Sequence, residues 1–155
     1  TDPVPGGFYM LLEGIEDPYN FGYALRSIYA AGANGVVMTP RNWMSAAGVV
    51  CRASAGASEL MPLSVAEPEE AVRIFRERGY KIVCADLREA VCAFDADLSR
   101  PLLVIVGGER RGISRALLEL ADLRVLLPYG REFSASLSAA SAASIIAYEV
   151  LRQNR

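Results

Sequence analysis

Short apolar runs alternate with amphipathic stretches along this chain. The apolar runs predict strands over residues 8–13, 35–38, 80–85, 102–106 and 124–127, with a short extended piece near 59–63. The amphipathic stretches predict helices over about 21–31, 44–52, 68–78, 114–121 and 137–152. The run 102–106 is apolar throughout, as is typical of a central parallel strand covered on both faces. Strands separated by helices predict an α/β fold, a three-layer sandwich around a mostly parallel sheet.

The length of 155 residues is that of one domain, which we expect to span 8–155. Residues 1–7 contain Pro3, Pro5, Gly6 and Gly7 before the first apolar run, and we interpret them as a linker or a truncated amino-terminal extension. The longest charge-free stretch, 133–148, is too short and too polar to span a bilayer, so no membrane partner is expected.

The composition excludes several chemistries. The chain has no histidine, which removes Ser-His-Asp and Cys-His nucleophile systems and His-containing metal sites. The cysteines Cys51, Cys84 and Cys92 lack the CxxC spacing of zinc ribbons and redox dithiols, so we expect no metal and a reducing, cytoplasmic location. The sequence contains no dinucleotide-binding G-x-G-x-x-G motif after a strand and no G-x-S-x-G motif. Gly107 and Gly112 have the spacing of a Walker loop, but Ile113 stands where that loop needs lysine.

Three segments that follow predicted strands are rich in glycine and polar residues. They cover 13–22, which leads into a helix carrying Arg26, then 107–114, and then 128–138. Because open parallel sheets bind ligands at the carboxyl ends of their strands, we expect these three segments to form one site.

The motifs in these segments, in chain order, are Asn20-x-Gly22-x-x-x-Arg26, Val106-Gly107-Gly108-Glu109-x-x-Gly112-Ile113, and Leu127-Pro128 followed by Ser136-Leu137. Their order resembles that of the SpoU–TrmH family, RNA ribose 2′-O-methyltransferases of the SPOUT class, and the resemblance covers Leu11 to about Arg152. It implies a carboxyl-terminal trefoil knot, S-adenosyl-L-methionine as cofactor, rRNA or tRNA as substrate, and an active site at a homodimer interface. The Ser- and Ala-rich last helix suits close packing against another backbone.

The resemblance also implies which residues bind the cofactor. It assigns main-chain contacts to Gly107, Leu127 and Leu137, with Gly108 in the same turn. Glycines at 107, 108, 112 and 130 allow tight turns and close backbone approach. The alternative for Leu127 and Leu137 is that they are core leucines.

For catalysis, the resemblance places Arg26 beside the target ribose. An arginine is a poor base, so we expect a nearby phosphate to take the proton while Arg26 stabilises the developing alkoxide. Glu109 is expected to pair with Asn20 or Arg26, the alternative being a carboxylate at a helix entry. Ser136 is expected to contribute a hydroxyl to the site, to cap the last helix, or to do both.

The third motif departs from the family pattern. The family usually has Ser-Leu-Asn where this chain has Ser136-Leu137-Ser138, so an active-site amide is replaced by a hydroxyl. This change leaves open a catalytically silent RNA-binding module of the same fold. A small-molecule α/β enzyme with a flavodoxin-like sheet is a further alternative, against which the three motifs count.

The RNA-binding expectation depends on arginine, which accounts for all but one of the 16 basic residues although the net charge is −2. Arginine's planar fork suits phosphate recognition, but biased genomic base composition would also explain the excess. A basic rim for RNA is expected at Arg41, Arg110, Arg111, Arg115 and Arg131. The alternative for each is solvated surface.

Overall fold

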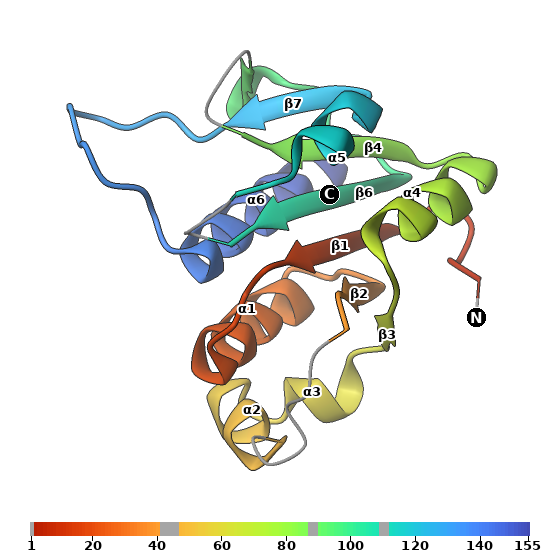
Figure 1. The fold of residues 1–155 in the computed structure, drawn as a ribbon, viewed down its shortest axis with the longest axis vertical. Coiled ribbons are helices and arrows are strands. Elements are labelled where there is room, and N and C mark those ends of the chain that lie inside the picture. Colours follow the sequence, from red (N-terminus) through yellow and green to blue (C-terminus); the bar gives the residue numbers. More distant parts are fainter. Residues whose placement is uncertain (1, 41–46, 87–89, 109–111) are drawn as a thin grey trace.

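The computed structural model describes residues 2–40, 47–86, 90–108 and 112–155. Strands in the described chain form one parallel sheet of order β3-β2-β1-β6-β4-β7-β5 (Figure 1). The strands are β1 (Phe8–Glu13), β2 (Gly35–Met38), β3 (Leu63–Val65), β4 (Lys81–Ala85), β5 (Val91–Cys92), β6 (Leu102–Gly107) and β7 (Leu123–Leu126). The helices are α1 (Pro18–Ala30), α2 (Ala47–Ala53), α3 (Ala57–Leu60), α4 (Pro68–Glu77), α5 (Arg115–Leu120) and α6 (Ala139–Asn154), with a 3₁₀ turn η2 (Ala93–Asp95).

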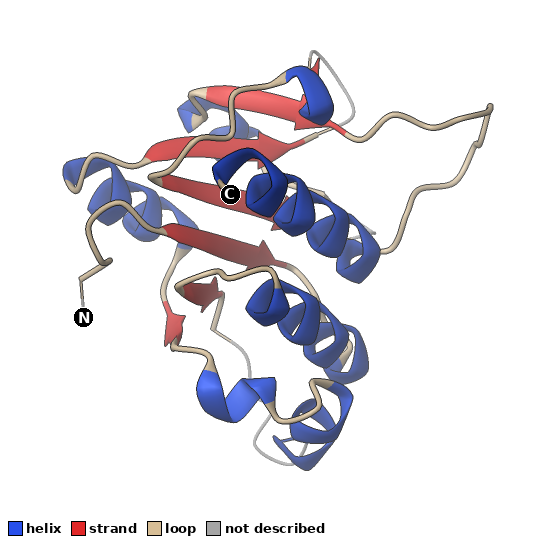
Figure 2. Cartoon of the chain, turned by 180° about the vertical axis from the view of Figure 1, so that it is seen from behind, coloured by secondary structure: helices blue, strands red, loops and turns tan. Residues whose placement is uncertain are grey.

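Two apolar cores lie on the two faces of this sheet. On β1, Met10 and Leu12 belong to the core that contains the inner faces of α1 and α6, whereas Leu11 belongs to the core beneath α4 and α5. Figures 1 and 2 show helices on both sides of the strands. All residues of 102–106 are buried, and β6 pairs with β1 and β4. The predicted three-layer parallel sandwich with 102–106 as a central strand is therefore confirmed, whereas the short strand β5 was not predicted.

Helix boundaries differ from the sequence expectation where capping decides them. Helix α1 begins at Pro18, earlier than predicted, because the Asp17 carboxylate accepts a hydrogen bond from the Tyr19 N–H (2.9 Å) and proline is tolerated in the first turn. Helix α6 begins at Ala139 because Ser138 caps it. The extended piece predicted near 59–63 is wrong at its start, since Ala57–Leu60 form α3 and the strand begins at Leu63.

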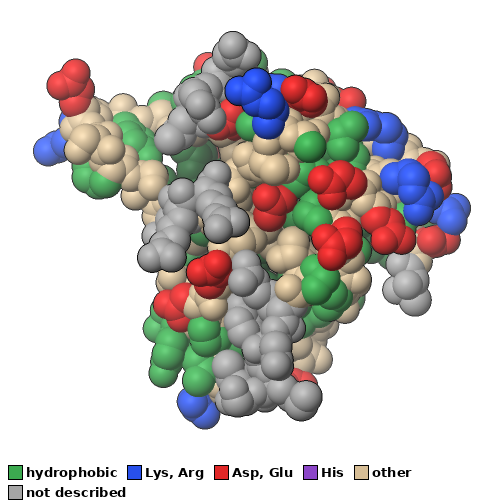
Figure 3. Space-filling model, viewed as in Figure 1, with side chains coloured by type: hydrophobic (Ala, Val, Ile, Leu, Met, Phe, Trp, Pro, Cys, Tyr) green, Lys and Arg blue, Asp and Glu red, His purple; other side chains and the backbone are tan. Residues whose placement is uncertain are grey.

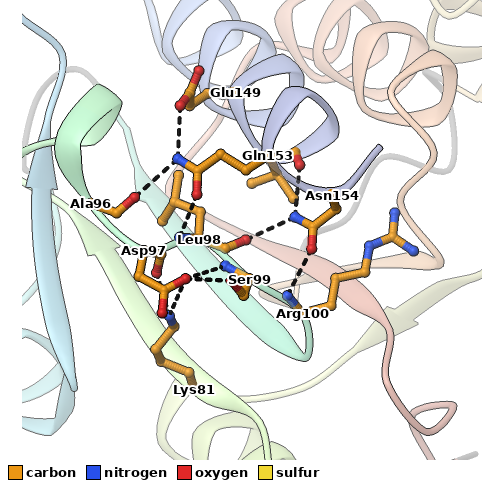
Figure 4. Close-up of polar contacts among 10 residues, drawn as sticks. Lys81, Ala96, Asp97, Leu98, Ser99, Arg100, Glu149, Gln153 and Asn154 are labelled. Carbon is orange, nitrogen blue, oxygen red and sulfur yellow. Dashed lines mark hydrogen bonds and ion pairs between the residues drawn. The ribbon is translucent and has the colours of Figure 1, made fainter.

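A network of side-chain amides fixes the carboxyl end of α6 (Figure 4). The Gln153 amide donates to Ala96 O (3.0 Å) and accepts from Leu98 N–H (2.9 Å), and Asn154 donates to Leu98 O (2.9 Å). The Gln153 amide also donates to Glu149, whose carboxylate is buried and accepts two bonds from the exposed Arg152. The segment that leads into β6 is thereby held against α6 through backbone groups that would otherwise lack partners.

The amino-terminal residues 2–7 lie against the domain, where the Gly7 N–H donates to the Tyr80 hydroxyl (3.1 Å). None of the helices in the described part of the chain combines the length and the apolar character that a membrane span needs. The trefoil knot and the boundary between residues 7 and 8 stay predictions.

The Glu149 carboxylate makes stability depend on pH. The hydrogen bond from Arg152 outweighs burial and lowers the pKa of Glu149 below its ordinary value. Its contribution is therefore present above the unfolded pKa of about 4.3 and is lost as the pH falls through the folded pKa. We expect Glu149→Gln to lower the free energy of unfolding at pH 7 and to lose this difference from wild type near pH 3, as measured by urea unfolding. Glu119→Gln, at an exposed position on α5, is the control. A difference in unfolding free energy between wild type and Glu149→Gln that is equal at both pH values would contradict the prediction.

Candidate functional site

The three motif-bearing segments meet at one edge of the sheet. Strands β1 and β6 end side by side, with Glu13 opposite Gly107, and β4 ends beside β7, with Ala85 opposite Val125. Because all these strands are parallel, the segments that follow β1, β6 and β7 leave from the same edge. The expectation that they lie together is confirmed.

A pocket of about 180 Å³, partly open to solvent, lies at this edge. All four predicted cofactor residues, Gly107, Gly108, Leu127 and Leu137, line it. The wall is otherwise mostly backbone and apolar side chains, contributed by Ala85, Asp86, Val106, Gly112, Ile113, Val125, Leu126, Tyr129, Ser136, Ala139, Ala142 and Ile146. Leu127 also packs against the core, as the alternative interpretation expected, and its contact with a cofactor stays a prediction.

Glycines let the first and second segments cross at backbone contact distance. A Cβ on Gly107 would lie 2.4 Å from the carbonyl carbon of Gly112, and one on Gly108 would lie 2.4 Å from the Gly14 oxygen. Gly112 has a φ of +64° and its N–H donates to Gly108 O (2.9 Å), which closes the turn. The glycine prediction is confirmed at 107, 108 and 112. It is wrong at Gly130, where a Cβ would meet no atom within 4 Å and φ is not positive.

Glu13, which the sequence reasoning did not single out, anchors the second segment. Its carboxylate accepts a hydrogen bond from the Ser114 backbone N–H, and Ser114 in turn caps α5 by accepting from the Leu117 N–H (3.3 Å). Burial outweighs this bond and raises the pKa of Glu13, and its Oε2 is buried without a hydrogen-bond partner in the described part of the chain. A carboxylate at the end of a central strand was the available signal in the sequence.

The third segment is closed by Tyr129, whose ring also lines the pocket. Its hydroxyl accepts a hydrogen bond from the Leu137 N–H (3.2 Å), and its ring lies 5.8 Å from that of the exposed Phe133. The chain between Leu127 and Ser138 extends well away from the sheet (Figures 1 and 2). The hydrogen bond from the Leu137 N–H to the Tyr129 hydroxyl joins residues near the two ends of this segment.

A separate groove of about 500 Å³ runs between α1 and α6. It contains the predicted catalytic residues Asn20 and Arg26 from α1 and Ser138 at the start of α6. The remaining lining residues are Tyr23, Ser27, Ala140, Ser141, Ser144 and Ile145. Arg26 is exposed, and among the described residues it has no hydrogen-bond or ion-pair partner. The fold thus places the arginine in a groove beside the third motif rather than on an isolated surface.

The Ser136–Ser138 motif joins the pocket to the groove. Ser136 and Leu137 line the pocket, whereas Ser138 lines the groove. Ser138 is the amino-terminal cap of α6, since its Oγ accepts from the Ser141 N–H (3.1 Å) and lies 3.0 Å from the Ser141 hydroxyl. The interpretation of Ser136 as the cap is therefore wrong, and Ser136 is instead an exposed residue of the pocket lining.

The remaining predicted residues are only partly described. Glu109, Arg110, Arg111 and Arg41 lie outside the described residues. Arg115 and Arg131 are exposed, at the start of α5 and on the 127–138 segment. On the face shown in Figure 3, the described basic and acidic side chains are interspersed rather than gathered into one basic surface. The basic rim stays a prediction.

Metal and thiol chemistry have no support among the described side chains. No group of three or more His, Cys, Asp or Glu residues in the described chain could hold a metal ion. All three cysteines are free, and burial raises the pKa of Cys84 to about 12. Cys84 is therefore a protonated core residue rather than a nucleophile.

Comparison with known sequences identifies related proteins. The sequence profile of the SpoU rRNA Methylase family matches residues 7–148. The chain is 35% identical to the 23S rRNA (guanosine-2′-O-)-methyltransferase RlmB of Shewanella oneidensis, over 96% of this chain and 60% of that protein. It is 34% identical to an uncharacterized tRNA/rRNA methyltransferase of Mycobacterium ulcerans, over 98% of this chain and 49% of that protein. The chain thus spans about half the length of the curated relatives it matches.

Solved structures of methyltransferases have the same fold as this chain. An AdoMet-bound rRNA methyltransferase from Sinorhizobium meliloti superposes with a TM-score of 0.88 at 28% identity, over 98% of this chain and 58% of that one. The SpoU methyltransferase AviRb from Streptomyces viridochromogenes, in complex with AdoMet, gives 0.87 at 30% identity, over 97% and 62% of the two chains.

The glycine crossing predicts a position-specific cost of adding one methyl group. Gly107→Ala and Gly108→Ala force a Cβ into backbone atoms and are each expected to lower the free energy of unfolding by about 1–3 kcal/mol. Gly130→Ala adds the same methyl where no atom lies within 4 Å and is expected to be nearly neutral. Urea unfolding of the three variants measures the difference, and equal costs at the three positions would contradict the crossing.

Proposed function

We propose that this chain, which belongs to the SpoU rRNA methylase family, is the catalytic domain of an enzyme that transfers a methyl group from S-adenosyl-L-methionine to a ribose 2′-hydroxyl of rRNA or tRNA. The observation that carries the proposal is the placement of two cavities on either side of one chain segment. The pocket that contains Gly107, Leu127 and Leu137 and the groove that contains Arg26 share the start of α6 as a common wall.

The pocket residues fit this cofactor. Gly107 and Gly108 line the pocket with backbone only, because the Gly112 and Gly14 backbone occupies the space that a Cβ would take at these positions. Apolar walls suit an adenine ring, and backbone N–H and C=O groups can recognise its edge. When bound, the cofactor supplies a methyl group activated by a positively charged sulfonium, which needs neither a metal nor an anchored phosphate.

Arg26 is the residue that we assign to the chemistry of the acceptor. Arginine side chains are permanent cations in proteins, so we assign Arg26 to stabilising negative charge rather than to accepting a proton. Exposed in the groove, it would bind the phosphate beside the target ribose and stabilise the developing charge on the 2′-oxygen, while that phosphate takes the proton. Asn20 and Ser138 in the same groove would orient the ribose, and positioning supplies most of the rate.

The exposed faces of α1 and α6 support a homodimer. Tyr19 and Tyr23 on α1, and Ile145 and Tyr148 on α6, are each 40–52% exposed beside or within the groove. A second copy covering these side chains would bury apolar area and close the groove to solvent. A homodimer acting on RNA in the cytoplasm is the assembly that we propose.

The silent-module alternative is favoured by Ser138, whose hydroxyl already caps α6. Calorimetric titration of the protein with S-adenosylmethionine separates the two functions. Binding supports the methyltransferase, whereas a folded protein that binds RNA but no cofactor would be the silent module.

Arg26→Ala is expected to reduce methyl transfer to an RNA substrate at least a hundredfold while changing cofactor affinity less than twofold, because the guanidinium lies in the groove and not in the pocket. Incorporation of labelled methyl groups and calorimetry measure the two quantities. Arg73→Ala is the control, since Arg73 lies on α4 and pairs with Glu77. Turnover that persists in the Arg26 variant would refute the role.

Tyr148→Arg is expected to convert the dimer to a monomer, because it places a charge within the exposed apolar face of α6. Leu60→Arg makes a comparable change on α3, where the leucine is 65% exposed, and is expected to leave the mass unchanged. Analytical ultracentrifugation distinguishes the two. The interface would be misplaced if Leu60→Arg dissociated the dimer and Tyr148→Arg did not.

A further inference from the structure

Asp86 is the one charged side chain among the described residues that line the pocket. It follows β4 directly, and its backbone N–H donates to Val125 O (2.9 Å), so the hydrogen bonding between β4 and β7 continues through it. Asp86 is half-buried, and none of the three motifs includes it. Its backbone is therefore fixed at the carboxyl edge of the sheet, and the residue lines a pocket whose other walls are mostly backbone and apolar groups.

The strand order separates Asp86 from the reacting groups. Asn20 and Arg26 lie on the helix that follows β1, whereas Asp86 follows β4, and β6 lies between these two strands. Two strand spacings amount to about 10 Å. Transfer into the groove would need the methyl group on the groove side of the pocket, which would direct the nucleoside end of the same ligand toward β4 and β7.

We propose that Asp86 binds the ribose hydroxyls of the cofactor nucleoside and so selects a ribonucleoside methyl donor. This inference rests on the proposed function. An ionised carboxylate offers two acceptor oxygens and no donor, which matches two neighbouring hydroxyl donors. In a half-buried pocket, hydrogen bonds to a charged acceptor are stronger than those between neutral groups. In this assignment, the apolar side chains and glycine backbone of the pocket contact the base, and Asp86 binds the hydroxyls of the sugar.

The test compares ligands that differ by one charge or by one hydroxyl. Calorimetry is carried out with S-adenosylmethionine, with S-adenosylhomocysteine, which lacks the sulfonium charge, and with the 2′-deoxy form of S-adenosylhomocysteine. We expect Asp86→Asn to weaken the binding of S-adenosylmethionine and of S-adenosylhomocysteine about tenfold. It should also remove most of the wild-type preference for S-adenosylhomocysteine over its 2′-deoxy form. Asp95→Asn, at an exposed position in η2 outside the pocket lining, is the matched control and is expected to change neither quantity.

A loss of folding would not produce this pattern, because it would weaken all three ligands equally and leave their ratio unchanged. Asp86→Glu retains the charge but displaces it, and we expect it to reduce the same preference with no change in the thermal midpoint. An unchanged preference in Asp86→Asn overturns the inference, as does a loss confined to the sulfonium ligand, which would mean that Asp86 pairs with the positive charge. A wild type that binds no cofactor overturns the proposed function as well, so the two failures are distinguishable.

Discussion

The close backbone crossing at the carboxyl ends of β1 and β6 is the constraint on which the site depends. Gly108 lies against the Gly14 carbonyl and Gly107 against the Gly112 carbonyl, at distances that leave no space for a Cβ. With this crossing in place, the segment after β6 forms one wall of the pocket, and Glu13 can hold Ser114 at the start of α5. Only residues without a side chain permit this approach, so the wall of the pocket consists of backbone at Gly107 and Gly108.

The start of α6 then separates the pocket from the groove, the proposed sites of methyl donor and acceptor. Its cap, Ser138, faces the groove, while the residue before it, Leu137, lines the pocket. The other end of the helix is fixed by Gln153 and Asn154, whose amides satisfy backbone groups of the segment that enters β6. A helix restrained at both ends fixes the position of the two adjoining cavities relative to each other. The proposed methyl transfer between two bound molecules requires such fixed positions.

Few of the described residues that line the two cavities are charged. The pocket wall carries Asp86, the groove carries Arg26, and Glu13 lies beneath the second segment with a raised pKa. In partly buried surroundings each such group acts over a short range on a specific partner. The proposed assignments follow from this separation, with the cation near the acceptor oxygen and the carboxylate near the sugar of the donor.

The sequence alone determined the layered parallel fold, the central strand 102–106 and the meeting of the three segments, because hydrophobic periodicity and strand direction are local properties that add up to a topology. It also located Asn20, Arg26 and the glycines at 107, 108 and 112. Only the tertiary structure decided that Ser138 rather than Ser136 caps α6, that Gly130 has no close neighbour, and that Glu13 and Asp86 belong to the site. These outcomes depend on which atoms from distant segments come within a few ångströms of one another, and one-dimensional spacing does not contain that information.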